Sequence, residues 1–230
     1  MLMNAYYFSI LQGSLMTVAV ALASLLLAVL FGLLGAAARL SANRLAEAAG
    51  TAYTTVIRGI PDLVLMLLVF YGGTMGLNYL MTAMGSKGSV DINPFVAGVL
   101  TLGFIYGAYM TETFRGAILA IPRGQSEAAQ AFGMGRTQTF LRIIAPQMVR
   151  YALPGFTNNW LVLIKSTALV SLIGLQEMTY LAKQASAATR SPFEFFLFTA
   201  ALFLFFTSAS LWVLRRLNTR YSVGIRRVAL

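Results

Sequence analysis

The stretch SLMTVAVALASLLLAVLFGLLGAAA, residues 14–38, holds 25 residues without one charged side chain. About 20 mostly apolar residues in a helix cross the roughly 30 Å hydrocarbon core of a bilayer, so this stretch is long enough to span a membrane. Three more charge-free windows follow at residues 63–86, 92–111 and 195–214, and residues 151–176 form a fifth that contains one charge, Lys165. The sequence predicts five membrane-spanning helices. The third is expected to continue as helix to Pro122.

The composition agrees with a protein that lives in lipid. Hydrophobic residues make up 58% of the chain and charged residues 10%, whereas about a quarter of the residues of a soluble domain are charged. The strands of a membrane β-barrel alternate polar and apolar residues, and these windows do not. We therefore expect an all-α integral membrane protein in which residues 1–230 form a single transmembrane domain.

Missing residue types exclude several kinds of chemistry. The chain has no cysteine and no histidine. Disulfides, Cys/His metal sites and catalysis that needs an imidazole base are therefore excluded. The formal net charge is +10, but the basic residues are interleaved with long apolar runs instead of forming one solvated patch, so no nucleic-acid partner is expected. We predict no catalytic residue, no metal site and no cofactor in this chain.

The distribution of basic residues predicts the orientation of the chain. With the N-terminus outside, 13 Lys and Arg residues fall in cytoplasmic segments and 3 in outer segments. Cytoplasmic loops of membrane proteins carry an excess of positive residues. We therefore predict that the N-terminus lies outside, that the C-terminus is cytoplasmic, and that the long loop at about residues 122–150 is cytoplasmic as well.

This loop contains SEAAQAFGMGRTQTFLRIIAP, residues 126–146. Ser126 is expected to cap a short helix and Gly133 to end it. Thr137 is expected to cap a second helix that ends at Pro146. The first helix would be about 9 Å long and unstable alone. It needs a surface to pack on.

The composition of this first helix favours a protein surface over a lipid surface. Glu127 lies in its first turn, where a negative charge suits the helix dipole. Ala128, Ala129 and Phe132 are expected to share one face, and such a small-residue face lets a partner approach closely. An interfacial turn on lipid headgroups is the alternative, but the helix lacks the basic face that binds anionic lipid.

Three charged residues are candidates for the substrate path, because charges inside a membrane are costly and usually functional. They are Asp62, Glu112 and Lys165. Each has a structural alternative: Asp62 caps a helix, Glu112 pairs with Arg115 three residues later, or Lys165 neutralises Glu112 or extends toward an interface. In the functional alternative, Asp62 and Glu112 attract a cationic substrate.

Two further pairs are of interest in the spans. Gly103 and Gly107 form a G-x-x-x-G pattern that lets helix backbones approach closely. Asn158 and Asn159 either bridge subunits through hydrogen bonds or line a polar path, and the sequence does not choose between these.

Several motifs resemble those of one transporter family. The spacing of Glu127-Ala128-Ala129, Gly133, Ile143 and Ala145-Pro146 resembles the EAA loop of membrane subunits of bacterial ABC importers, in which leucine usually occupies the position of Ala145. The following stretches resemble polar amino-acid permeases, most closely the histidine/lysine/arginine/ornithine and opine branch: RGIPDLVLMLLVFYG (58–72), GAYMTETFRGAILAIPRGQ (107–125), NNWLVLIKSTALVSLIGLQEM (158–178) and YSVGIRR (221–227).

The resemblance implies a type I ABC importer permease fold in the bacterial inner membrane. It implies that residues 127–133 are a coupling helix that docks on a cytoplasmic ATPase dimer. ATP and Mg would be bound by that ATPase, since this chain has no phosphate-binding loop of the G-x-x-x-x-G-K-[ST] type. The other implied partners are a second permease, expected to be a related but different chain, and a periplasmic substrate-binding protein.

Two rival functions come from other classes. A membrane-embedded enzyme is disfavoured, because the seven acidic residues are scattered and no histidine is present. An ATP-independent channel or ion-coupled carrier remains the alternative. It would not need a docking helix on its cytoplasmic side.

Overall fold

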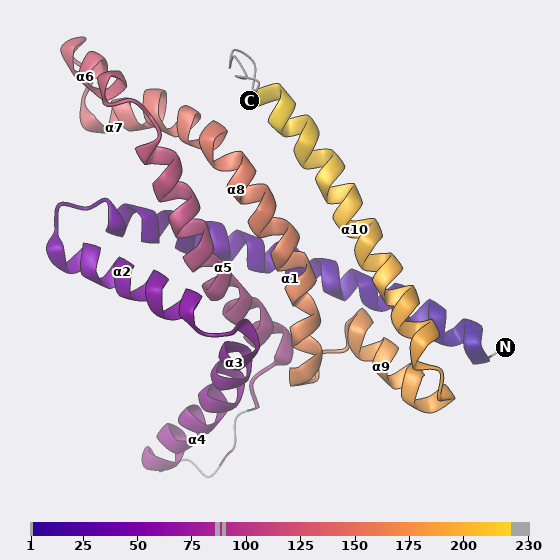
Figure 1. The fold of residues 1–230 in the computed structure, drawn as a ribbon. Coiled ribbons are helices and arrows are strands. Elements are labelled where there is room, and N and C mark those ends of the chain that lie inside the picture. The colour runs from indigo at the N-terminus through magenta and orange to yellow at the C-terminus, as the bar shows by residue number, and fades with distance from the viewer. Residues whose placement is uncertain (1, 86–87, 89–90, 222–230) are drawn as a thin grey trace.

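The computed structural model describes residues 2–85, 88 and 91–221, and its regular structure within these ranges is entirely helical (Figure 1). The last residues of the YSVGIRR motif, 222–227, and Lys87 lie outside the described residues. The helices are α1 (Leu2–Arg39), α2 (Arg44–Gly59), α3 (Asp62–Leu67), α4 (Gly73–Ala83), α5 (Pro94–Leu119), α6 (Arg123–Ala131), α7 (Arg136–Thr139), α8 (Ala145–Ser166), α9 (Met178–Thr189) and α10 (Pro192–Tyr221). Three short segments continue or join them: η1 (Leu68–Gly72) and η2 (Phe140–Ile144) are π-helical, and η3 (Thr167–Ile173) is a 3₁₀ helix.

Five segments of the described chain are long and apolar enough to cross a membrane, as the sequence predicts. They are Met3–Arg39, Asp62–Ala83, Pro94–Leu119, Arg136–Ile173 and Pro192–Thr219. The third ends at Leu119, just before Pro122, which confirms the expected stop. The predicted all-α membrane class is confirmed. Because five crossings place the two chain ends on opposite sides, the loop with α6 and α7 lies at the same end of the molecule as the C-terminal end of α10 (Figure 1).

Glycines allow α1 and α5 to pack closely, and this pair forms the centre of the molecule. A Cβ on Gly103 would lie 2.6 Å from the Leu27 Cβ, and one on Gly107 would lie 2.6 Å from the Phe31 Cβ. Gly32 of α1 approaches α5 in the same way. The predicted close backbone approach at the G-x-x-x-G pattern is therefore confirmed, and its partner is α1.

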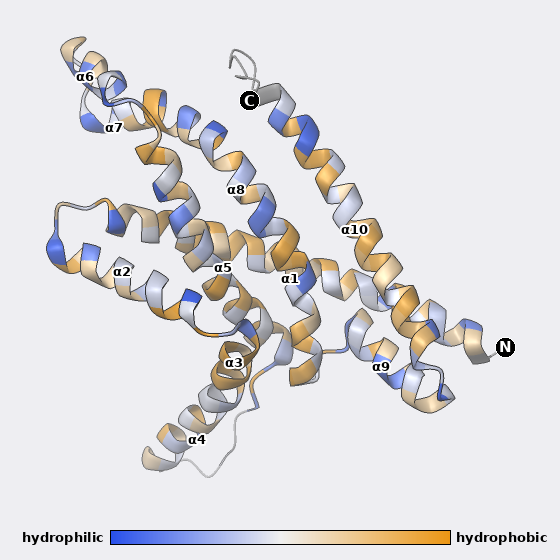
Figure 2. Ribbon diagram, in the orientation of Figure 1, coloured by the Kyte–Doolittle hydropathy of each residue, from blue (hydrophilic) through white to orange (hydrophobic). Residues whose placement is uncertain are grey.

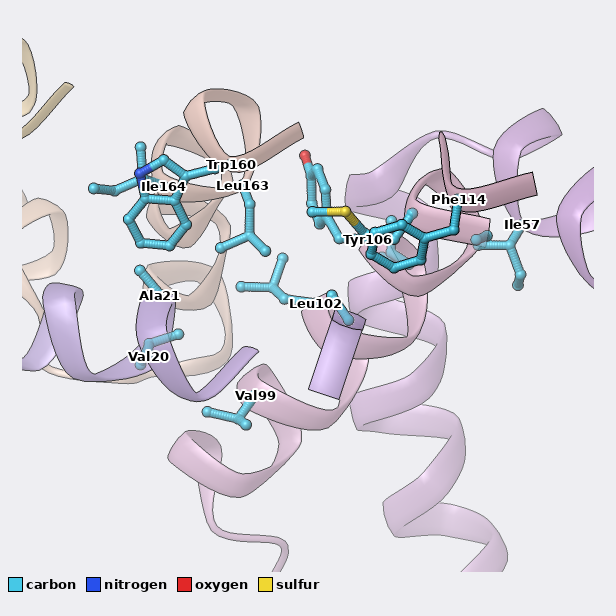
Figure 3. Close-up of a cluster of buried hydrophobic side chains, with 14 of the residues drawn as sticks. Val20, Ala21, Ile57, Val99, Leu102, Tyr106, Phe114, Trp160, Leu163 and Ile164 are labelled. Carbon is cyan, nitrogen blue, oxygen red and sulfur yellow. The ribbon is translucent and has the colours of Figure 1, made fainter. Parts of the chain in front are cut away.

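The main core forms where α5 meets α1, α2 and α8. Its buried side chains include Leu102, Tyr106, Leu163 and Val20, and Figure 3 shows them converging from these helices. The spans differ in the burial of their most apolar window, a segment of 18 residues. In α5, 67% of this window is buried, against 11% in Asp62–Ala83 and 6% in Pro192–Thr219. Thus α5 is the central helix, while α4 and α10 lie at the periphery, where lipid or another chain must cover them (Figure 2).

A smaller core fixes the N-terminal end of α1 to α9 and α10. Phe195 is fully buried there, with Tyr6 and Tyr7 of α1 against its ring at centroid distances of 6.0 and 5.1 Å. Ile10 and Met178 complete this cluster. The N-terminal ends of α1 and α10 are therefore joined to each other and to α9 by this cluster.

The second crossing begins with a break that the sequence partly predicts. Asn43 caps α2 by accepting a hydrogen bond from the Leu45 N–H at 2.9 Å, and α2 ends at Gly59. Pro61 then forms the N-cap of α3, and Asp62 is the first helical residue, where the span was expected to start. The amphipathic helix α2, which precedes this break and packs on α1 and α5, was not predicted.

Candidate functional site

The loop between α5 and α8 carries a short exposed helix, α6, near the predicted position. It begins earlier than expected, at Arg123, with Pro122 as its N-cap. Ser126 does not cap it, because its hydroxyl donates to the Arg123 carbonyl at 2.8 Å, back within the same helix. The prediction of a Ser126 cap was wrong. Proline already provides a good helix start, since its missing N–H would be unpaired in the first turn.

Gly133 ends this helix as predicted. Its φ of +80° lies in the left-handed region that glycine adopts without a Cβ penalty. The Gly133 N–H donates to the Gln130 carbonyl at 2.9 Å and the Met134 N–H to the Ala129 carbonyl at 3.0 Å. These two bonds are the Schellman pattern, which pairs the last carbonyls of a helix. The glycine therefore sets both the length of α6 and the direction in which the chain leaves it.

The side chains of α6 divide between two faces, and the single face predicted from spacing is wrong. Phe132 is 89% exposed, and Glu127 and Ala128 are exposed as well. Ala129 is only 5% exposed, and α6 as a whole packs against α7 and η2. Residues three and four positions apart are neighbours on a helix, so spacing alone does not separate the two alanines; their burial does, with Ala128 exposed like Phe132 and Ala129 buried. An exposed aromatic tip thus projects beside a small side chain at one end of the molecule.

From α7 onward, the return to the membrane is continuous helix. α7 has Gly135 as its N-cap, so the predicted Thr137 cap was wrong. The chain passes through the π-helical η2 into α8, with Pro146 in the first turn of α8, so the predicted end at Pro146 was wrong too. A proline is tolerated there because the wider π turn before it changes the hydrogen-bond pattern, and the first turn of a helix does not need its N–H.

Glu112 lies in α5 and forms an ion-pair network. Its Oε2 is 2.9 Å from Arg115 Nη2, and its Oε1 is 3.6 Å from Arg39 Nε at the end of α1. The structural alternative, pairing with Arg115 on one helix face, is confirmed. The additional partner Arg39 was not anticipated, because the contact joins residues 73 positions apart in the sequence.

Asp62 lies where three elements meet. The Tyr106 hydroxyl of α5 donates to Asp62 Oδ2 at 3.2 Å and lies 2.6 Å from the Ser166 Oγ at the end of α8. Asp62 makes no side-chain capping bond, and Pro61 occupies the cap position. The capping alternative is therefore wrong in this form, although the carboxylate still lies in the first turn of α3, where its charge is favourable.

Lys165 stays apart from both acids. Its side chain is exposed, and Glu112 is already paired with two arginines. The alternative in which Lys165 neutralises Glu112 is wrong. Asp62 is bonded to Tyr106 of α5, and Glu112 belongs to α5 itself, six residues further along. The structure thus places two of the three candidates at α5 and leaves Lys165 exposed on α8.

Asn159 bridges two helices of this chain. Its Nδ2 donates to Thr113 Oγ1 at 3.0 Å, and the residue is 8% exposed. This bond joins α8 to α5, an arrangement that neither sequence-based alternative for the asparagine pair included. Asn158 is exposed.

Sequence reasoning missed Glu177, the acid most deeply buried in the described chain. Glu177 is 0% exposed. Its Oε2 accepts a hydrogen bond from the Thr17 hydroxyl of α1 at 3.0 Å, and its Oε1 accepts one from the Tyr180 N–H at 2.8 Å. Burial raises the pKa of the Glu177 carboxyl. The sequence signal that could have revealed this residue is a lone acid three positions after a glycine, Gly174. In the structure Gly174 ends η3 and has a left-handed φ of +86°.

Comparison with known proteins identifies the family. The model of "Binding-protein-dependent transport system inner membrane component" matches residues 24–223. The histidine/lysine/arginine/ornithine transport system permease protein HisQ of Escherichia coli (strain K12) is 54% identical, covering 96% of each chain. The octopine transport system permease protein OccQ of Rhizobium radiobacter is 42% identical over 97% of this chain and 94% of the relative.

Solved structures agree. An amino acid ABC transporter crystallised with histidines superimposes with a TM-score of 0.80 at 30% identity, covering 95% of this chain and 96% of that one. The MetNI methionine ABC transporter shares the fold, with a TM-score of 0.74 at 16% identity. These relatives are transport permeases and not enzymes. The chain belongs to the family of binding-protein-dependent transport system inner membrane components.

Proposed function

We propose that the chain is the permease subunit of an ATP-driven importer of basic amino acids or related opines. Residues 1–230 would form its one transmembrane domain, with the loop at about 122–150 in the cytoplasm. The names of the relatives at 54% and 42% identity support this substrate class. The ATP-independent channel or carrier lacks a supporting observation of this kind.

One observation carries the proposal: the exposed tip of α6. Phe132 is 89% exposed next to the exposed residues Ala128 and Glu127. Figure 2 shows that this end of the molecule carries many hydrophilic residues. An aromatic side chain held out among polar residues is the typical anchor of a protein interface. We assign Glu127, Ala128, Phe132 and Gly133 to ATPase docking, while Ala129 supports the helix from inside.

Membership of the family supports an ATPase and a substrate-binding protein as partners. A dimer of ATPase subunits would bind ATP and Mg and receive the α6 tips of two permeases. The second permease would be a related but different chain, and a periplasmic binding protein would deliver the amino acid. Closure of the ATPase pair would move α6, and the spans would reorient as rigid bodies between inward- and outward-facing states.

Asp62 is the stronger candidate for attracting a cationic substrate. Its carboxylate accepts one hydroxyl bond and forms no ion pair in the described chain. Glu112 is already neutralised by Arg115 and Arg39, so it has less charge to offer a substrate. Lys165, exposed on α8, would face the path or the neighbouring permease.

The docking role is tested with Phe132→Ala in the assembled importer. We expect substrate-stimulated ATP hydrolysis and uptake to fall by about tenfold or more, since removing a central aromatic anchor typically costs at least 2 kcal/mol. Phe193→Ala is the matched control, because Phe193 is 76% exposed but lies at the start of α10, at the opposite end. Equal effects of the two variants would count against docking through α6.

The substrate class is tested separately. The reconstituted complex should be stimulated by binding protein loaded with arginine, lysine, histidine or an opine, and little by binding protein offered glutamine. An ATPase that fails to co-purify, or uptake that continues without ATP, would support the channel or carrier alternative instead.

A further inference from the structure

A polar cavity of about 420 Å³ opens between α1, α2 and α5. It is lined by Arg39, Thr54, Thr55, Arg58, Gly59, Tyr109 and Glu112. Two guanidinium groups, one carboxylate, two hydroxyls and one phenol thus surround a space large enough for an amino acid. Arg39 is the last residue of α1 and Arg58 the last but one of α2, so two of the 13 basic residues counted as cytoplasmic line this cavity.

The charges around this cavity do not balance. Glu112 is engaged by Arg115 at 2.9 Å, and its contact with Arg39 is longer, at 3.6 Å. Arg58 forms no ion pair within the described chain, and its guanidinium lies over the Tyr109 ring, 5.2 Å from the centroid. The cavity therefore has excess positive charge, and a small anion would complete it.

An aromatic pair connects this cavity to Asp62. The Tyr109 and Tyr106 rings have centroids 5.6 Å apart, and the Tyr106 hydroxyl donates to Asp62 Oδ2 at 3.2 Å. Arg58 is at one end of the pair and Asp62 at the other. A cationic group and an anionic group are thus held on the same side of α5, separated by two tyrosines.

We propose that this cavity binds the α-carboxylate of the substrate amino acid, with Arg58 as the main partner and Arg39 beside it, while the cationic end of the substrate extends toward Asp62. The proposal rests on the proposed import of basic amino acids and adds which part of the substrate is recognised. A planar guanidinium suits a carboxylate because it donates two parallel hydrogen bonds. The two opposed charges match a substrate with a carboxylate at one end and a cation at the other.

The experiment measures binding to the purified complex without its binding protein, in nanodiscs of phosphatidylcholine. Arginine is compared with agmatine, which is arginine without the carboxylate. The wild-type complex should bind arginine about tenfold more tightly than agmatine. Arg58→Gln should remove this preference by weakening arginine binding alone, and Arg58→Lys should keep part of it.

Arg44→Gln is the matched control, since Arg44 is an exposed arginine at the other end of α2. It should retain the preference. Equal binding of arginine and agmatine by the wild-type complex, no binding of either, or an unchanged preference in Arg58→Gln would overturn the proposal. The wild-type comparison and Arg58→Lys decide the matter if Arg58→Gln does not assemble.

Two further outcomes distinguish the carboxylate site from a lipid-phosphate site and from a failure of the proposed import function. If the effect of Arg58→Gln appears only when phosphatidylglycerol is added to the nanodiscs, the cavity binds a lipid phosphate and the carboxylate proposal is wrong. If the complex neither binds the ATPase nor imports basic amino acids, the proposed function fails. A complex that imports arginine without preferring it to agmatine contradicts only the carboxylate site.

Discussion

Glu177 carries a carboxyl group into the interface between α1 and α9. It caps α9 through the Tyr180 N–H and accepts the Thr17 hydroxyl across the interface. Gly13 permits this contact, because a Cβ there would lie 3.1 Å from the Met178 nitrogen. Burial raises the carboxyl pKa from its ordinary value of 4.5 more than these bonds lower it. The residue therefore joins the two helices and links their stability to pH.

The sign of this linkage gives a prediction for Glu177→Gln. A raised carboxyl pKa in the folded state means that folding favours the protonated form. The stabilisation is complete below pH 4.5 and is lost as the pH rises through the folded-state pKa. Glutamine does not titrate. We expect the apparent Tm of the wild type, relative to that of Glu177→Gln, to fall as the pH is raised from about 4 to about 8. At the upper end of this range the Gln variant should be the more stable protein. The measurement is thermal unfolding of the purified complex at a fixed scan rate.

Glu194→Gln is the control for this measurement, since it removes an exposed carboxylate near the start of α10. The effect of Glu177→Gln is read relative to it. A constant Tm difference across the pH range would show that Glu177 does not couple its protonation to folding.

Individual residues were predictable from sequence where local chemistry decides their role. Gly133 and the Glu112–Arg115 pair depend on neighbours one turn away, and both predictions were confirmed. Other contacts join residues that are far apart in the sequence, so no periodicity reveals them. Examples are the contacts of Arg39 with Glu112, of Tyr106 with Asp62 and of Thr17 with Glu177. Ser126 shows the opposite failure, because the better helix start at Pro122 displaced a plausible cap.

At the scale of elements, the pairing of α1 with α5 depends on small residues on both helices. In lipid, helices associate mainly through close packing, and glycine permits the closest approach. Gly107 is such a contact, since a Cβ there would lie 2.6 Å from both the Phe31 Cβ and the Tyr53 hydroxyl oxygen. Tyr53 itself donates to the Phe104 carbonyl at 2.6 Å, so it is not free to move aside. The pair therefore has little room for an added methyl group.

Two substitutions in α5 should have opposite effects. Gly107→Ala should destabilise the protein by about 1–3 kcal/mol through overpacking. Gly116→Ala should stabilise it by up to about 1 kcal/mol, because alanine is the better helix former and no atom lies within 4 Å of the new Cβ. The measurement is the apparent Tm of each variant complex. Equal shifts in the same direction would show that the contact with α1 does not limit stability.

The existence of long helices was predictable because hydrophobicity over 20 residues is a strong signal. Their interruptions were not. The π segments η1 and η2, the 3₁₀ segment η3 and the helix α2 depend on tertiary contacts and on polar residues that mix with apolar ones. Pro146 shows this well, since its sequence context reads as a helix end and its place after η2 makes it a helix start.

The whole molecule is a set of helices around α5 with much of its apolar surface open. Only 6% of the most apolar window of α10 is buried, and 11% of that in Asp62–Ala83. Five crossings and the class of fold followed from composition, but composition does not say which exposed face meets lipid and which meets another subunit. The side on which each end lies is also a prediction, resting on the 13 to 3 division of basic residues.

That orientation is tested with single cysteines, and the natural sequence has none to interfere. Ala131→Cys, exposed at the end of α6, should react with a membrane-impermeant thiol reagent only after the cells are permeabilised. Ala188→Cys, exposed near the end of α9, should react in spheroplasts without permeabilisation. The reverse pattern would invert the molecule and remove α6 from the cytoplasm.

The poor coverage of α10 has a consequence for how cells must produce this polypeptide. The rest of the chain buries very little of α10. Membrane proteases can therefore reach this helix until the second permease, its companion subunit, covers it. We expect an orphan copy, synthesised without its companion, to be degraded quickly, so its abundance would follow the dosage of the companion gene and not the strength of its own promoter.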